Sequence, residues 1–165
     1  MTDTEAGARQ ALDSHEAFER TNERYRVTTT VFEATVAVDT TSEMPKYTVT
    51  VDVPTLDGAA EDDVGPTVSI DWFETLDRRL QNAPKATLVE VELDEYHLTK
   101  DDDTVTVEYV FSQERPQTAA DVAKTFVEYV EGTYAEGIIP GYEYRSPVDN
   151  LLSSASQGGD GGTPL

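Results

Sequence analysis

Alternation of apolar and polar residues constrains the fold of this chain more than any other feature. It is clearest over residues 47–53 and 105–111, where every odd-numbered residue is apolar and all but one of the even-numbered residues are polar. Successive side chains of a strand point to opposite faces of a sheet, so these segments have one face toward a core and one toward water. This pattern is typical of an antiparallel sheet that is covered on one side.

Three shorter segments carry the same pattern: residues 25–27, 32–38 and 89–93. The apolar positions change from odd to even numbers between Val31 and Phe32, which predicts a bulge or a tight reversal there. Three aspartates at 101–103 separate segment 89–93 from segment 105–111, and we expect them to form the acidic turn of a hairpin.

Apolar residues at helical spacing predict three helices. The first covers roughly residues 5–18, behind a capping-box pattern of Thr2 and Glu5. The second begins at Asp71 or at Pro66 and ends before Pro84, and the third begins at Thr118. Their expected apolar stripes are Ala8, Ala11, Leu12, His15 and Phe18, then Trp72, Phe73, Leu76 and Leu80, then Val122, Ala123, Phe126, Val130 and Tyr134.

The element order is therefore α-β-β-(β)-α-β-β-α. It predicts the α+β class, with an antiparallel sheet of four or five strands and helices packed on one face. Secretion-chaperone-like folds have the same order, but shared topology alone carries no function. We expect an exposed loop over 55–66, a single domain over 1–152, and a disordered Ser- and Gly-rich tail over 153–165.

Several classes of protein are excluded by what the sequence lacks. The chain has no cysteine, which excludes disulfide scaffolds, thiol nucleophiles and thiolate zinc sites. It also lacks a secretory segment and any run of about 18 apolar residues, so we expect a cytoplasmic protein with no membrane partner.

The charge balance is strongly acidic, because 33 Asp and Glu oppose 12 Lys and Arg for a formal net charge of -21. Screening shortens to about 3 Å at 1 M salt, where such a surface stays hydrated without strong self-repulsion. We interpret the composition as adaptation to high salt. Mimicry of a nucleic acid is the alternative, whereas direct nucleic-acid binding is not expected because no basic stripe exists.

No residue pattern indicates a catalytic centre, a metal site or a cofactor. His15 and His97 are single histidines with no serine nucleophile at a suitable spacing, and each is expected to be a packing residue. The acidic runs at 61–63 and 101–103 lack the ligand spacing and central glycine of a calcium loop. The glycines at 158–162 are not flanked by the strand and helix of a phosphate loop.

Two features are candidates for binding a partner. Arg78 and Arg79 are adjacent bases in an acidic chain; they either pair with Glu74 and Asp77 or anchor an acidic ligand. The second feature is the segment 138–144, which either folds back to complete the core or forms an exposed interface patch. Its candidate partner-binding residues are Ile138, Ile139, Tyr142 and Tyr144.

Five strings of residues together resemble a family of small acidic haloarchaeal proteins of unknown function. The resemblance covers nearly all of the chain except the glycine-rich tail, and it implies a salt-adapted cytoplasmic protein with no catalytic residues to transfer. The strings are Tyr25-Arg26-Val27-Thr28-Thr29-Thr30, Pro54-Thr55-Leu56-Asp57, Trp72-Phe73-Glu74-Thr75-Leu76 followed by Arg78-Arg79, Val130-Glu131-Gly132-Thr133-Tyr134, and Ile139-Pro140-Gly141-Tyr142.

The leading hypothesis is a non-enzymatic protein-interaction module, an adaptor or small chaperone-like protein that binds an unidentified protein partner. A homodimer is one assembly that this hypothesis allows. The alternatives are a small carboxylate-dependent hydrolase or isomerase, which requires a carboxyl group of raised pKa in an apolar pocket, and the nucleic-acid mimic.

Overall fold

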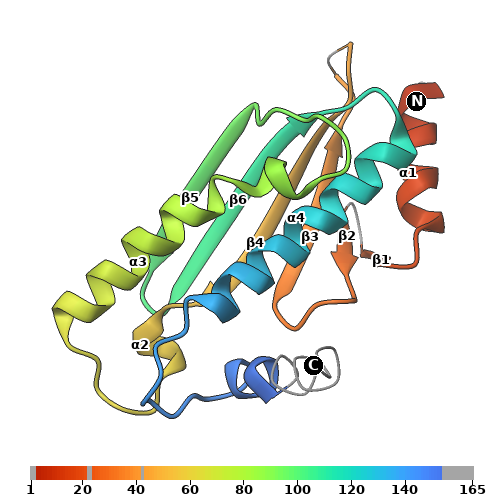
Figure 1. Cartoon of the computed structure of the whole chain (residues 1–165). Helices are drawn as coiled ribbons and strands as arrows, with labels where there is room; N and C mark the ends of the chain where they lie inside the picture. Colours follow the sequence, from red (N-terminus) through yellow and green to blue (C-terminus); the bar gives the residue numbers. More distant parts are fainter. Residues whose placement is uncertain (1–2, 22–23, 42, 154–165) are drawn as a thin grey trace, which may run out of the picture.

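The computed structural model describes residues 3–21, 24–41 and 43–153. It is an α+β structure in which helices lie along one face of a sheet (Figure 1). The elements in chain order are α1 (Asp3–Ser14), β1 (Phe18–Thr21), β2 (Arg24–Val27), β3 (Glu33–Asp39), β4 (Lys46–Pro54), α2 (Leu56–Ala59), α3 (Pro66–Leu80), the 3-10 helix η1 (Ala83–Ala86), β5 (Glu95–Asp101), β6 (Thr104–Ser112) and α4 (Pro116–Glu136).

The sheet has six antiparallel strands in the order β1-β2-β3-β4-β6-β5. The prediction of four or five strands was wrong because Phe18, assigned to the first helix by its spacing, lies in β1. The helix α1 ends at Ser14, and the ring nitrogen Nδ1 of His15 accepts a 3.2 Å hydrogen bond from the amide of Ala17. The helix does not continue past this contact, and Phe18 lies in the first strand of the sheet.

The two segments of clearest alternation are strands, as predicted, and they pair with each other as β4 and β6 in the interior of the sheet. Their register pairs Val49 with Tyr109 and Val51 with Val107, and all four side chains are buried on the helix-covered face. The opposite face carries partly exposed polar pairs such as Thr50 and Glu108. One-sided burial therefore fixes the register, since a slip by one residue would exchange the two faces.

The hairpin of β5 and β6 corrects the prediction of a strand at 89–93. Asp101 pairs with Thr104, so only Asp102 and Asp103 form the turn, and Asp102 has φ 51, in the left-handed region. This tight turn places residues 95–101 opposite β6 and leaves 88–94 as an irregular segment. The predicted reversal after Val31 is confirmed, because it separates β2 from β3.

The helices differ from the predictions mainly at their ends. The helix α3 begins at Pro66 after Gly65, the earlier of its two predicted starts, whereas α4 begins at Pro116 rather than at Thr118. A proline fits the first helical position because its missing N–H would have no partner there. The capping residue Thr2 lies outside the described residues, as does the predicted tail from residue 154 onward.

The segment 55–66 is less exposed than predicted because it contains the short helix α2. The Oγ1 atom of Thr55 accepts a 3.0 Å hydrogen bond from the amide of Gly58 and caps this helix. Leu56 and Ala59 are buried in the core beneath the end of the sheet. Figure 1 shows α2 at that end, with α4 crossing the sheet between α1 and α3.

Candidate functional site

A groove lies between α3 and the C-terminal end of α4, and the segment that follows α4 closes one end of it. Its volume is about 490 Å³. Its apolar surface comes from α3 and from the segment after α4, and residues from α3 line its length from Val68 to Arg79. The lining residues are Val68, Asp71, Trp72, Thr75, Leu76, Arg79, Thr133, Glu136, Gly137, Ile138 and Ile139.

The two helices run antiparallel, and two contacts fix their register (Figure 1). At one end, the hydroxyl of Tyr129 donates a 2.7 Å hydrogen bond to the carbonyl oxygen of Arg79. At the other end, the rings of Trp72 and Tyr134 meet edge to face with centroids 5.7 Å apart. The C-terminal turn of α4 therefore lies opposite Trp72.

The end of α4 creates the closed end of the groove. The amide of Gly137 donates hydrogen bonds of 3.1 Å to the carbonyl oxygens of Thr133 and Tyr134, and the chain then turns away through Ile138 and Ile139. Both isoleucines are half-buried, pack against the core and line the groove. They supply apolar surface that is available to a ligand.

The indole N–H of Trp72 is buried at this end without a hydrogen-bond acceptor among the described residues. The residue is 5% exposed, and its Nε1–H hydrogen bonds to no other described residue. Gly137 lies next to it without a side chain, since a Cβ atom built there would be 3.9 Å from Nε1. A buried donor without an acceptor costs about 1–3 kcal/mol, so this N–H would gain from an acceptor.

The charged residues of the groove are separated along its length. Asp71 from α3 and Glu136 from α4 are exposed beside the Trp72 end. Arg79 is two turns further along α3, about 12 Å from Asp71 at 1.5 Å per residue. The groove is thus acidic at the end closed by Ile138 and Ile139 and basic at the end near Tyr129.

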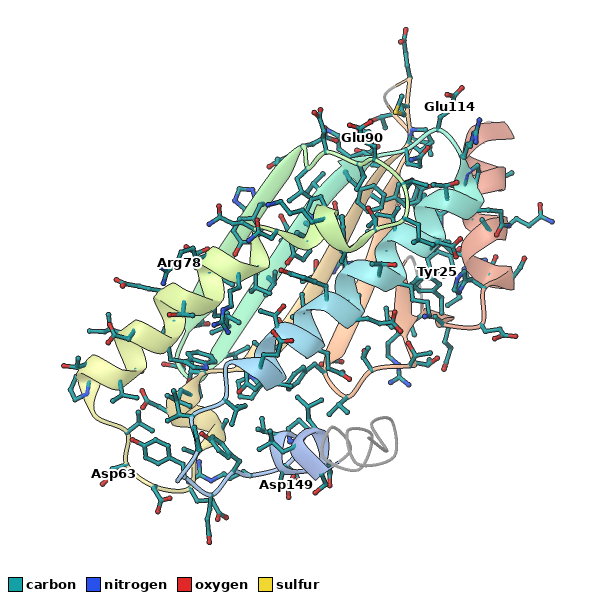
Figure 2. All side chains as sticks on the ribbon, in the orientation of Figure 1. Tyr25, Asp63, Arg78, Glu90, Glu114 and Asp149 are labelled. Atoms are coloured by element: carbon teal, nitrogen blue, oxygen red, sulfur yellow. The ribbon has the colours of Figure 1, made fainter. Side chains whose placement is uncertain are left out.

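Three of the six residues predicted to bind a partner line this groove: Arg79, Ile138 and Ile139. Arg78 lies outside it and is exposed, with a 3.4 Å hydrogen bond to Oγ1 of Thr75 (Figure 2). Neither arginine makes an ion pair within 4.0 Å to another described side chain, so the expected pairs with Glu74 and Asp77 are not seen.

Tyr142 and Tyr144 also lie outside the groove, in a segment that folds back against α2. Tyr144 forms an antiparallel bridge with Ala60, and its hydroxyl donates a 2.5 Å hydrogen bond to the carbonyl oxygen of Ile139. Next along the chain, the amide of Arg145 donates to the carbonyl oxygen of Ala59 at 2.7 Å. The segment therefore helps to close the core as well as one end of the groove.

Trp72, Glu136 and Gly137 were not among the predicted site residues. Helical spacing places Trp72 on the apolar face of its helix, which correctly predicts burial but not an unpartnered N–H. Glu136 and Gly137 end α4, and their position opposite Trp72 depends on the register of two helices far apart in the sequence. The only sequence feature that could have pointed to this site is that Trp72 is the single tryptophan of the chain.

Each of the two histidines hydrogen bonds to neighbouring residues of the fold. Because the amide of Ala17 donates to Nδ1 of His15, the proton of the neutral ring lies on Nε2, which donates to Oδ1 of Asp121 at 3.0 Å. This contact ties α4 to the end of α1. Exposed His97 pairs with Glu95 of the same strand. No cluster of three metal-binding side chains occurs in residues 3–21, 24–41 and 43–153.

The fold and the groove together define an α+β protein with an open antiparallel sheet and a ligand-sized groove on its helical layer. The chain belongs to a family of unknown function (DUF5813), which matches residues 13–154 and so includes the whole groove. No curated protein and no solved structure matches the chain. Within the described ranges, no helix is both long and apolar enough to span a membrane.

Proposed function

We propose that this chain is a non-enzymatic protein-interaction module that binds an apolar segment of a partner protein in the groove between α3 and α4. The groove itself carries the proposal, because apolar side chains from α3 and from the segment after α4 converge on one open cavity of about 490 Å³. Pockets of roughly 300–1,000 Å³ with apolar walls and a few polar groups are typical binding sites.

The shape of the groove favours a peptide segment. Its wall on α3 extends from Val68 to Arg79, about 16 Å at 1.5 Å per residue. This length matches three turns of a helix laid along it, the arrangement in which an amphipathic helix places its apolar face in a groove. The half-buried Ile138 and Ile139 would then contact the apolar side chains of the partner.

Adaptation to high salt is part of the same proposal. No described Asp or Glu side chain is buried, so these carboxylates lie where water and ions reach them. Few cations neutralise them; examples are Lys124 with Glu128 at 2.9 Å and Arg26 with Glu19 at 3.9 Å. A surface of this kind remains soluble when salt screens its repulsion.

The hydrolase or isomerase alternative has less support from this geometry. It needs a carboxyl group in an apolar enclosure, whereas Asp71 and Glu136 are exposed at the edge of the groove. One carboxyl–tyrosine pair is hydrogen bonded: the hydroxyl of Tyr96 donates to Oδ1 of Asp77 at 2.9 Å. Neither residue lines the groove. The nucleic-acid mimic remains a separate prediction, tested by competition with DNA for a DNA-binding protein.

The test is affinity co-purification at molar KCl with a variant that fills the groove. Thr75→Tyr places a ring in the groove, and Thr48→Tyr is the matched control on the open face of β4. We expect a stoichiometric partner to be captured by the wild-type chain and by Thr48→Tyr but not by Thr75→Tyr. Equal capture by all three, or by none, contradicts binding in the groove.

A further inference from the structure

We infer that the partner segment is basic: it places a Lys or Arg between Asp71 and Glu136, and a neighbouring carbonyl oxygen accepts a hydrogen bond from Nε1 of Trp72. This inference rests on the proposed function and names the chemistry of the partner. It follows from two independent features of the same end of the groove, the pair of carboxylates and the unpartnered indole N–H.

The carboxylates supply the charge complementarity. Asp71 and Glu136 come from opposite walls and line the same end of the groove, without an ion pair to any described cation. A Lys or Arg side chain bound at this end would offset the negative charge of both carboxylates. Because Arg79 is at the other end, a segment with its basic residue toward Trp72 and its acidic or carboxylate end toward Arg79 matches both ends.

The indole supplies the hydrogen bond. Trp72 is 5% exposed and lines the groove, and its Nε1–H has no acceptor among the described residues. Gly137 lies beside this N–H and begins the half-buried segment 137–139. The proposed contact requires this segment, which also lines the groove, to shift outward so that a main-chain carbonyl of the partner accepts the hydrogen bond.

The first experiment selects ligands without knowledge of the natural partner. A library of random twelve-residue peptides is displayed and selected on the wild-type chain in 1 M KCl, where long-range attraction to the acidic surface is screened to about 3 Å. The same library is selected on Thr75→Tyr. We expect peptides enriched only on the wild type to combine apolar residues at helical spacing with at least one Lys or Arg.

Two paired sets of variants then locate the basic residue. Asp71→Asn with Glu136→Gln removes both carboxylates of the groove. Glu90→Gln with Glu92→Gln removes two exposed charges of the loop before β5, where Figure 2 labels Glu90. We expect the first pair to weaken an enriched peptide at least tenfold and the second pair to leave its Kd unchanged. Equal weakening by both pairs would show attraction to the whole surface and overturn the inference.

A glycine pair tests the hydrogen bond. Gly137→Ala puts a methyl group 3.9 Å from Nε1 of Trp72 in ordinary contact with its neighbours, and Gly132→Ala adds one where no atom lies within 4 Å. Since Trp72 is the single tryptophan, its fluorescence reports binding directly. We expect Gly137→Ala to weaken the peptide several-fold and Gly132→Ala to have no effect; equal affinities would overturn the contact.

The outcomes separate this inference from the proposed function. Enrichment of acidic or uncharged peptides that Thr75→Tyr fails to bind would overturn the basic partner and leave the groove as a peptide site. Absence of any peptide specific to the wild type would contradict the proposed function itself.

Discussion

The hydroxyl of Tyr109, in the middle of β6, donates a 2.7 Å hydrogen bond to the carbonyl oxygen of Leu80, the last residue of α3. The final carbonyls of a helix have no partner within the helix, so this bond satisfies one of them inside the core. It also fixes the end of α3 to the sheet. The position of the groove wall thus depends on a side chain of an interior strand of the sheet.

Replacing Tyr109 with Phe should therefore destabilise the fold, by about 1–3 kcal/mol, because the buried carbonyl of Leu80 loses its donor. The matched control is Tyr47→Phe, since both tyrosines are 0% exposed and the hydroxyl of Tyr47 hydrogen bonds to no described residue. Denaturant unfolding at molar KCl measures both. We expect no loss of stability for Tyr47→Phe, and equal losses for the two variants would contradict this explanation.

The parts of the fold that could be predicted are those fixed by the alternation of apolar and polar residues within one strand. Alternation around Val49 and Tyr109 places both on the buried face because the period of a strand is local. The strand β5 was predicted at 89–93 because that segment alternates more clearly than 95–101, whose apolar residues are only Tyr96 and Leu98. Only the tight turn at Asp102 decides which of them pairs with β6, and left-handed backbone at an aspartate is not apparent from alternation.

The candidate site was less predictable because it depends on tertiary register. Ile138 and Ile139 could be found as apolar residues in a segment that cannot be a regular helix. Nothing in the sequence places Glu136 across from Asp71, because that requires knowing how α3 and α4 align. The sequence left open whether Tyr144 completes the core or belongs to an interface, and its bridge to Ala60 places it in the closure of the core.

Tyr142 and Tyr144 should differ in their effect on stability. Tyr144→Ala removes the hydrogen bond to Ile139 and the packing of the ring against the core, so we expect a loss of about 2–3 kcal/mol. Tyr142→Ala removes a side chain outside the core cluster and should cost under about 1 kcal/mol. Thermal melting of the two variants in the same buffer gives the comparison, and equal losses would show that Tyr142 also belongs to the core.

Alkaline pH should unfold the protein through its buried tyrosines. Burial raises the pKa of Tyr47 from 10.0 to about 12, and it also raises the pKa values of Tyr96, Tyr109 and Tyr134. Above pH 10 the unfolded chain releases protons that the folded chain retains, so stability is complete below pH 10 and falls as the pH rises toward 12.

The slope of this decline counts the retained protons, at about 1.4 kcal/mol per pH unit for each fully retained proton. Tyr47→Phe should make the decline shallower, because one of the raised groups is gone. Unfolding free energies measured between pH 9 and 11.5 check the slope. A stability that is constant or rises over this range would contradict the burial of these hydroxyls.

Salt should stabilise the fold because the net charge of -21 is carried by surface carboxylates. The screening length grows from about 3 Å at 1 M salt to about 30 Å at 0.01 M, so repulsion extends across the molecule when salt is removed. We expect the melting temperature to fall steadily from molar to millimolar KCl, with loosening or unfolding below a few tenths molar. Sucrose is the control, since it favours compact states without screening charge. An unchanged melting temperature would refute adaptation to salt, and full recovery in sucrose would assign the effect to solvent exclusion rather than to charge repulsion.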